Sequence, residues 1–406
     1  MKLEFTYGDG LLAVDIPEGK SVDTFSPRKS KNPIGCDQFH EMSKETLAAF
    51  ADQDDPLIVV NDAYRNTPTP QVLECIDHNQ PGLIDRSEFL VATGTHAAPT
   101  SDQLDIIFGS YRDRVLDRLN IHDCRNPECM TDVGLDKFAE PVFVNTQFMH
   151  AQRPLLISSV EPHYFAGFSG GRKSIFPGLA DLKTVERNHN LANSMAAQPL
   201  KLDGNPVADH LMNLASIANM QKMLGIQLVV DSTGEVASVS CGALHDSFMA
   251  ATERAFNIFA NKVEQPYDIV LCELTAPLDR NLYQIQKALE NCQGGVADGG
   301  SLVLISKCTE GIGTRAFYDL AKEWNRERNR PRKGQLKFGS HKLTRVVNHT
   351  KRIHVHVVSD LDAADVRQVF YEPLDNLNEF LFIAWNNSAA ARVAAVFDAG
   401  NTVLTI

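Results

Sequence analysis

A glycine-rich segment with two adjacent cations, residues 161–178, is the part of the sequence best suited to chemistry. It reads EPHYFAGFSGGRKSIFPG and holds four glycines together with Arg172 and Lys173. Glycines such as Gly170 and Gly171 let a backbone approach an anion closely and point N–H groups at it. The spacing is not that of a Walker A loop, because Arg172 rather than a glycine precedes Lys173. Alone, the segment fits a phosphate-binding loop and a tight structural turn, with Lys173 solvated, equally well.

Three histidines fall at the ends of expected strands or in the stretches that follow them: His96, His163 and His189. A single histidine is most often a surface residue or a hydrogen-bonded core residue. These three, however, accompany Asp62, Arg65 and Lys173, and chance explains such a set poorly. His189 lies in a helical pattern shortly after the glycine-rich segment, where a neutral imidazole could face the same cavity as Lys173.

Two other histidine clusters have simpler explanations. The segment from His122 to Cys129 resembles a metal knuckle but lacks the second ligand pair of a structural zinc site, which favours a loop. His354 and His356 are spaced to share one face of a strand, and we interpret them as part of a half-exposed strand rather than a metal site.

Strand-like runs that alternate with helical patterns must position these side chains. Such runs occur at 57–60, 89–93, 155–159 and 226–230, and they indicate an α/β layered fold. Ligands in such folds bind beyond the carboxyl ends of the strands. Asp62, His96 and His163 follow three of these runs.

A second block of strands, at 268–272 and 301–305, indicates a second α/β domain. We expect an N-terminal domain over residues 1–262 and a C-terminal domain over 263–394, with the C-terminal strand 395–406 returning to the first. An active-site cleft between the domains is expected.

Composition excludes several classes of protein. The chain has 406 residues and a formal net charge of −12, which argues against nucleic acid or an anionic membrane as the main partner. A basic stretch at 322–342 is interpreted as a solvated helix end and loop. No apolar run approaches the roughly 20 residues of a membrane span, and no signal-peptide core is visible. Eight scattered cysteines are interpreted as reduced thiols of a cytoplasmic protein.

With these residues assembled, the chain resembles the nickel-pincer lactate racemase family, whose relatives include racemases and epimerases of other 2-hydroxy acids. The most specific match is the run H-Y-F-A-G-F-S-G-G-R-K-S-x-x-P-G within 161–178. Further matches are Asn32–Gly35, Asn61–Asp62, Arg65, Thr67–Pro68, Ala92–His96, Asn188–His189, Leu278–Gln284, Lys287 and Val358–Leu361.

The resemblance implies an isomerase that holds nickel in a pyridinium-3-thioamide-5-thiocarboxylic acid mononucleotide made by cofactor-biosynthesis proteins. It implies Lys173 as the covalent tether, His189 as the nickel ligand, and His96 and His163 as catalytic residues. The cofactor contacts would also include Asp62, Gly170, Gly171, Arg172 and Tyr283. The substrate contacts would be Arg65, Tyr64, Gln284 and Lys287.

The implied reaction is chemically reasonable for this substrate class. Removing the C2 proton of a 2-hydroxy acid is difficult, because the neighbouring carboxylate already carries negative charge. Hydride transfer to the cofactor, through a planar 2-keto acid, and return to the opposite face avoids that carbanion. Each orientation of the hydroxyl needs its own base, a role suited to two histidines. We further expect Arg65, Arg172, Lys173 and Lys287 to converge on one positive site.

Departures from the family pattern lie near the substrate. Tyr64 and Asn66 stand where the family often has a small hydroxyl residue and a proline, and Ala97 replaces a frequent arginine. These changes leave the identity of the substrate open, since the volume and hydroxyl of Tyr64 could select against lactate or for a polar substituent. An inactive carrier of the nickel-pincer cofactor is the alternative function. A zinc hydrolase using His122 and Cys124 has no HExxH-type motif to support it.

Overall fold

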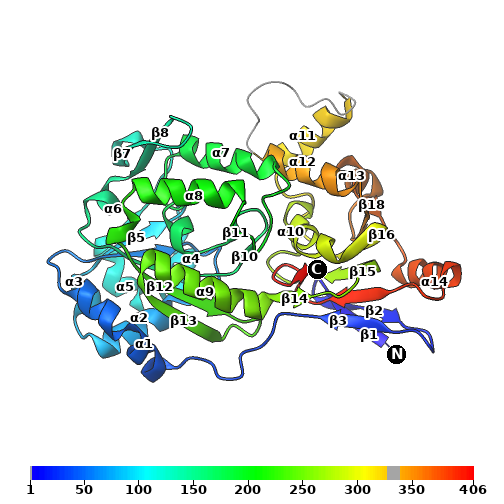
Figure 1. The fold of residues 1–406 in the computed structure, drawn as a ribbon, viewed down its shortest axis with the longest axis horizontal. Coiled ribbons are helices and arrows are strands. Elements are labelled where there is room, and N and C mark those ends of the chain that lie inside the picture. Colours follow the sequence, from blue (N-terminus) through cyan, green and yellow to red (C-terminus); the bar gives the residue numbers. More distant parts are fainter. Residues whose placement is uncertain (1, 327–338) are drawn as a thin grey trace. The chain divides into compact units, whose positions relative to one another are not determined.

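The chain folds into two compact units, neither of which is continuous in sequence. The computed structural model describes residues 2–326 and 339–406 (Figure 1). The central unit comprises residues 28–192 and 201–258, and the terminal unit comprises 1–27, 193–200 and 259–406. Both units contain mainly parallel sheets with helices, which confirms the expected α/β class.

The central unit is built on a six-stranded sheet. Its strands, in spatial order, are β13 (Val236–Ala243), β12 (Leu224–Val230), β9 (Leu155–Ser159), β4 (Leu57–Asn61), β5 (Glu88–Ala92) and β6 (Leu119–Ile121). All neighbours run parallel except β13, which is antiparallel to β12. The apolar runs that predicted β4, β5, β9 and β12 are buried on both faces, as parallel strands require.

Nine α-helices and two hairpins complete the described part of the central unit. The helices are α1 (Cys36–Ala51), α2 (Thr69–Asn79), α3 (Leu83–Arg86), α4 (Ser101–Phe108), α5 (Arg112–Val115), α6 (Thr146–His150), α7 (Leu182–Asn190), α8 (Pro206–Ile217) and α9 (Leu244–Phe259). The hairpins are β7 (Met130–Leu135) with β8 (Pro141–Asn145), and β10 (Pro162–His163) with β11 (Gly167–Phe168). Apolar side chains of α1, α2 and α4 form one core with the sheet.

The terminal unit has its own six-stranded sheet, in which every neighbouring pair is parallel. The spatial order is β18 (Glu372–Pro373), β17 (His354–Val358), β16 (Val296–Ile305), β15 (Tyr267–Glu273), β19 (Val393–Val396) and β3 (Val22–Phe25). The accompanying helices are α10 (Leu282–Cys292), α11 (Arg315–Arg326), α12 (Ser340–His349), α13 (Ala363–Gln368) and α14 (Leu377–Asn387). The remaining strands are β1 (Lys2–Tyr7), β2 (Gly10–Asp15), β14 (Ala260–Lys262) and β20 (Val403–Thr405).

The unit boundaries differ from the expected domains 1–262 and 263–394. Residues 1–27 belong to the terminal unit because β3 pairs with β19, at the far end of the chain. The C-terminal strand β20 pairs with β14, and both lie in the terminal unit. These pairings join segments that are 371 and 143 positions apart, so no local pattern reveals them.

A buried ion-pair network joins two helices of the terminal unit. Arg345 of α12 donates to both carboxylate oxygens of Glu290 on α10, and His349 Nε2 lies 3.0 Å from Glu290 Oε2. Burial alone would raise the pKa of Glu290, but the charges of His349 and Arg345 lower it to about 2. The network therefore holds a carboxylate in the interior through paired charges.

The structure corrects two expectations about side chains. Cys36 of α1 and Cys75 of α2 form a disulfide, so the eight cysteines are not all reduced thiols. The helices bring these two residues, 39 positions apart, to a Cα separation of 5.3 Å. Lys342, at the end of the basic stretch, is buried and lies over the ring of Tyr283 rather than in solvent. Residues 327–338 of that stretch lie outside the described part of the chain.

Among the described residues, no helix combines the length and hydropathy that crossing a bilayer requires.

Candidate active site

A cavity of about 100 Å³ opens at the carboxyl ends of β4 and β5 in the central unit. Six of the residues singled out from the sequence line it: Asp62, Arg65, His96, His163, Lys173 and His189. Gly170 also lines this cavity, which we call the central pocket. The position agrees with the rule that ligands of α/β sheets bind beyond strand carboxyl ends.

The glycine-rich segment is a tightly packed loop at the pocket wall. Gly171 has a φ of +51°, and a Cβ atom there would lie 2.4 Å from the Phe248 ring. Its N–H donates to Gln227 Oε1 at 2.8 Å and to Ser158 Oγ at 3.2 Å. This amide is thus bonded within the protein instead of facing a ligand. Glycine is required here for both conformation and space.

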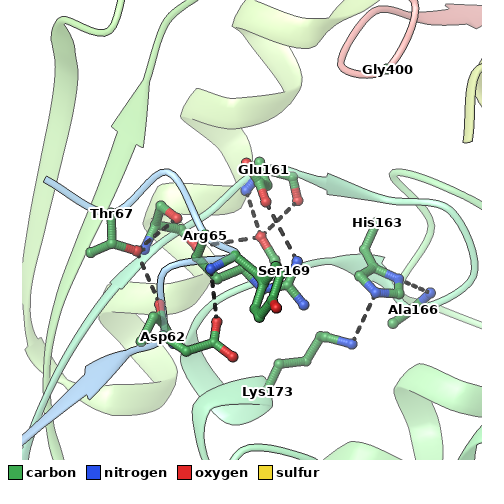
Figure 2. Close-up of polar contacts among 12 residues, drawn as sticks. Asp62, Arg65, Thr67, Glu161, His163, Ala166, Ser169, Lys173 and Gly400 are labelled. Carbon is green, nitrogen blue, oxygen red and sulfur yellow. Dashed lines mark hydrogen bonds and ion pairs between the residues drawn. The ribbon is translucent and has the colours of Figure 1, made fainter. Parts of the chain in front are cut away.

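Lys173 is a buried amine in the pocket. Its pKa is well below the usual range because of burial and the nearby positive charges of Arg65 and Arg172. The amine nitrogen lies 3.2 Å from His163 Nε2, and Figure 2 shows the two side chains pointing toward each other. Lysine nitrogen is nucleophilic only without its proton, so this environment favours covalent chemistry at Lys173.

The hydrogen bonds of His163 also favour an unprotonated amine at Lys173. The backbone N–H of Ala166 donates to His163 Nδ1 at 3.3 Å, so Nδ1 carries no hydrogen (Figure 2). A neutral imidazole then has its hydrogen on Nε2, the nitrogen that faces Lys173. For that hydrogen to be donated, the Lys173 nitrogen must be an unprotonated acceptor. Hydrogen-bond geometry and burial therefore both favour an unprotonated amine at Lys173.

Arg172 has a different environment from Lys173. It is 2% exposed, and its guanidinium stacks on the Phe248 ring at 4.6 Å. Burial lowers its pKa to about 10. Its Nε and Nη1 have no hydrogen-bond acceptor among the described residues. Arg172 does not line the central pocket, although its charge acts on Lys173.

His96 is oriented by a short hydrogen bond to a buried carboxylate. Its Nδ1 lies 2.6 Å from Asp62 Oδ2, and Asp62 is 7% exposed. A carboxylate oxygen can only accept, so the ring hydrogen is on Nδ1 and the neutral ring has its lone pair on Nε2. The ring of Tyr64 packs against His96 at 4.6 Å and is itself exposed. His96 and His163 thus present opposite hydrogen-bonding character at Nε2.

His189 lies near the end of helix α7. Its Nδ1 is 3.0 Å from the carbonyl oxygen of Val185, which fixes the hydrogen on Nδ1 and makes Nε2 the nitrogen able to bind a metal. Its ring packs edge-on against Phe165. Among the described residues no three His, Cys, Asp or Glu side chains are grouped to hold a metal ion. A metal at His189 would therefore need donors from outside the chain, which is what a tethered pincer ligand supplies.

Arg65 has a neighbour that the sequence did not single out. Its Nη1 lies 3.6 Å from Glu161 Oε1, a loose ion pair visible in Figure 2. The quoted motif contains Glu161, but only the fold brings it beside Arg65. A polar cluster of Asn61, Thr67 and Ser159 adjoins the site and was also not foreseen as a group. None of these positions carries a chemical signal in sequence alone.

Three predicted residues lie in the terminal unit. Tyr283, Gln284 and Lys287 are on helix α10. Lys342 lies over the Tyr283 ring, with Nζ 3.5 Å from its centroid. The expected cofactor and substrate contacts of these residues, and the expected convergence of Lys287 with Arg65 and Lys173, stay predictions.

The two clusters set aside in the sequence have structural roles. His122 is buried with Nε2 3.1 Å from the carbonyl oxygen of Ala180, while Cys129 is exposed. His354 and His356 lie on β17 and both approach Glu372, at 3.6 and 3.5 Å.

Comparison with known proteins gives a consistent assignment. Residues 7–199 match the family model for the lactate racemase N-terminal domain, and residues 263–404 match the model for the lactate racemase C-terminal domain. The chain is 27% identical over 416 residues to a lactate racemase of Thermoanaerobacterium thermosaccharolyticum, covering 94% of each chain. It is 27% identical over 396 residues to a lactate racemase of Lactiplantibacillus plantarum, covering 90% of this chain and 87% of that one.

Solved structures share the fold. The lactate racemase apoprotein from T. thermosaccharolyticum superposes with a TM-score of 0.83 at 24% identity, with both chains covered completely. A Thermotoga maritima protein gives a TM-score of 0.69 at 17% identity, covering 93% of this chain and 99% of that one. Since the two family models together span most of the sequence, the chain belongs to the lactate racemase family and is an isomerase.

Proposed function

We propose that this chain racemises or epimerises a 2-hydroxy acid, using a nickel-pincer nucleotide attached to Lys173 and bound through nickel to His189. The observation that carries the proposal is the central pocket, where Lys173, a buried lysine with a lowered pKa, lines one cavity together with His96, His163 and His189. When bound, the group supplies an acceptor for the C2 hydrogen as hydride. The relatives named lactate racemase support this reaction class.

The residues of the chain supply the proton chemistry and the orientation. Arg65 binds the substrate carboxylate, and Glu161 beside it restricts where that carboxylate can sit. His96 accepts the hydroxyl proton at Nε2 from one enantiomer, because Asp62 holds its hydrogen on Nδ1. His163 serves the opposite enantiomer after its ring hydrogen moves from Nε2 to Nδ1, since Nε2 must hold a lone pair to accept that proton.

Loading must change the hydrogen bonding of His163. The bond between His163 and Lys173 uses the amine lone pair as acceptor. A thioamide nitrogen has no such lone pair available. Covalent attachment at Lys173 therefore removes the acceptor of the Nε2 hydrogen, and His163 becomes a base once that hydrogen shifts to Nδ1 and the bond from Ala166 N–H is broken.

Tyr64 supports a substrate other than lactate. Its ring covers part of His96 and replaces the small residue common in the family, which alters the volume beside the general base. Gln284 and Lys287 are proposed to complete the substrate site. The protein is proposed to act in the cytoplasm, with cofactor-biosynthesis proteins as its partners.

The decisive experiment combines peptide mass spectrometry with chiral assays. The chain is produced together with the cofactor-making enzymes, and the peptide that contains Lys173 is weighed. We expect added mass on Lys173 and nickel in the protein, and neither adduct nor inversion in Lys173→Arg. Enantiopure lactate, malate and a C2-epimerisable aldonate, followed by chiral chromatography, identify the substrate. Inversion by a protein with unmodified Lys173 would contradict the proposal.

The carrier alternative is distinguished from the racemase by its expected results. For a racemase, His96→Ala and His163→Ala should each abolish inversion while the adduct and nickel remain. A carrier would show adduct and nickel in the unaltered chain but no inversion of any 2-hydroxy acid.

A further inference from the structure

Helix α7, which carries His189, is too short to set its own orientation. It has nine residues and is capped by Asp181, whose side chain accepts from Lys183 N and Thr184 N. Isolated helices below about 12 residues are marginal in water, so tertiary contacts must fix the direction of α7.

Asp136 lies just after strand β7 and binds helix α7 from outside the helix. Its side chain is fully buried, and Oδ2 accepts from Arg187 Nε at 2.6 Å. The other oxygen, Oδ1, accepts from the backbone N–H groups of Phe138 and Glu140. Because those backbone bonds fix Asp136 to its own turn, the carboxylate is a rigid anchor for Arg187.

His210 of α8 connects the Asp136 carboxylate to Asn188, the next residue of α7. Its side chain is fully buried, and Nε2 lies 3.0 Å from Asp136 Oδ2. Its Nδ1 lies 3.2 Å from Asn188 Nδ2, and Asn188 Nδ2 also donates to Val207 O. Since the carboxylate accepts and the amide donates, His210 is a neutral ring with its hydrogen on Nε2. In the series of hydrogen bonds Asp136–His210–Asn188, each donor therefore faces an acceptor.

The anchored positions 187 and 188 directly precede His189 on a helix that turns about 100° per residue. Holding both of them fixes the rotation of α7 about its axis, and with it the direction of the next side chain. We propose that Asp136 and His210 are positioning residues that aim His189 into the central pocket for metal binding. The inference rests on the proposed function, because it assigns His189 the role of nickel ligand.

The test measures nickel retention rather than turnover. Wild-type and Asp136→Asn proteins are loaded by co-production with the cofactor-making enzymes, and nickel release into excess EDTA is followed by elemental analysis. Residues that orient a metal ligand typically change affinity about 10- to 100-fold, and we expect release from Asp136→Asn to accelerate by that factor. The adduct on Lys173 should remain.

The matched control is Asp231→Asn. Asp231 is a buried aspartate of the same unit that accepts from the Ser30 and Thr233 backbones and does not contact α7. General destabilisation would accelerate nickel release in both variants, whereas positioning affects only Asp136→Asn. Equal release rates in the two loaded variants would overturn the inference and leave the proposed function standing. Wild-type protein without an adduct on Lys173 would instead contradict the proposed function.

A milder variant covers the case in which Asp136→Asn does not fold. Arg187→Met removes the ion pair between α7 and Asp136 and leaves the Asp136–His210 bond in place. It should also release nickel faster than the control, and release at the control rate overturns the inference. In the unloaded protein, hydrogen exchange of the α7 amides should accelerate in Arg187→Met relative to Asp231→Asn, which checks the positioning role without cofactor.

Discussion

The variant Asp62→Asn tests whether Asp62 determines which ring nitrogen of His96 carries the hydrogen. The structure dictates which way the new amide will face. Tyr64 N donates to Asp62 Oδ1 at 3.2 Å, so that position needs an oxygen. The amide NH2 of the variant is then left facing His96 Nδ1. A donor at that place moves the ring hydrogen to Nε2, which removes the lone pair that would accept the substrate proton under the proposed function.

The size of the effect follows from the lost hydrogen bond. A hydrogen bond to a charged group contributes about 1.5–3 kcal/mol. The His96 side chain is 45% exposed, so solvent screening favours the lower end of that range. Since about 1.4 kcal/mol corresponds to tenfold in rate, misorientation alone lowers kcat/KM about 10-fold. The unfavourable tautomer adds to this, and we expect a total loss of about 10- to 100-fold.

The assay is kcat/KM in both directions on protein of known nickel content. For two enantiomers of equal free energy the two values must fall by the same factor, which gives an internal check. Asp231→Asn should leave kcat/KM per loaded molecule unchanged. If Asp62→Asn retains kcat/KM within about 3-fold of wild type, the tautomer argument is refuted.

Three further predictions concern stability, each measured by denaturant unfolding. Glu290→Gln should cost about 3 kcal/mol near neutral pH, because it leaves Arg345 buried without its carboxylate. Since the folded pKa of Glu290 is lowered to about 2, its contribution is full above the ordinary 4.5 and lost as pH falls toward 2, so the difference between the proteins should vanish there. A difference that persists at pH 2 would contradict the linkage. Gly171→Ala should cost about 2–5 kcal/mol from its left-handed backbone and the clash with Phe248, and unchanged stability would contradict the close packing. Cys36→Ser should lower stability by about 3–4 kcal/mol and make it insensitive to dithiothreitol; equal sensitivity in both proteins would count against the disulfide.

Both tryptophans of the chain, Trp324 and Trp385, lie in the terminal unit. Their fluorescence therefore reports the unfolding of that unit for Glu290→Gln. The other two variants belong to the central unit, and circular dichroism over the whole chain follows their unfolding.

The sequence predicted elements whose information is local. The runs at 57–60 and 155–159 are dense in β-branched and leucine residues, and the structure has β4 and β9 there. Side chains after these runs could be placed near one another because parallel strands end at a common edge. Asp62, His96 and His163 were found in that way, and they line one pocket.

The remaining features depend on contacts between distant segments. Phe248 lies under Gly171 and Arg172, yet nothing in helix α9 marks it as part of the loop. Likewise, β3 pairs with β19 although more than 360 residues separate them in the numbering. Tertiary packing decides such pairings, and one sequence holds no direct record of it.

The low pKa of the Lys173 amine is a consequence of folding. In an unfolded chain the same side chain is hydrated, has a pKa near 10.4 and carries its proton at neutral pH. Burial next to Arg65 and Arg172 lowers that pKa and favours the unprotonated form, so the proposed covalent attachment requires a folded central unit. Under the proposed function, cofactor loading thus discriminates between folded and misfolded copies, and the fraction of protein that carries the adduct would be a chemical record of how much of the chain reached its native state.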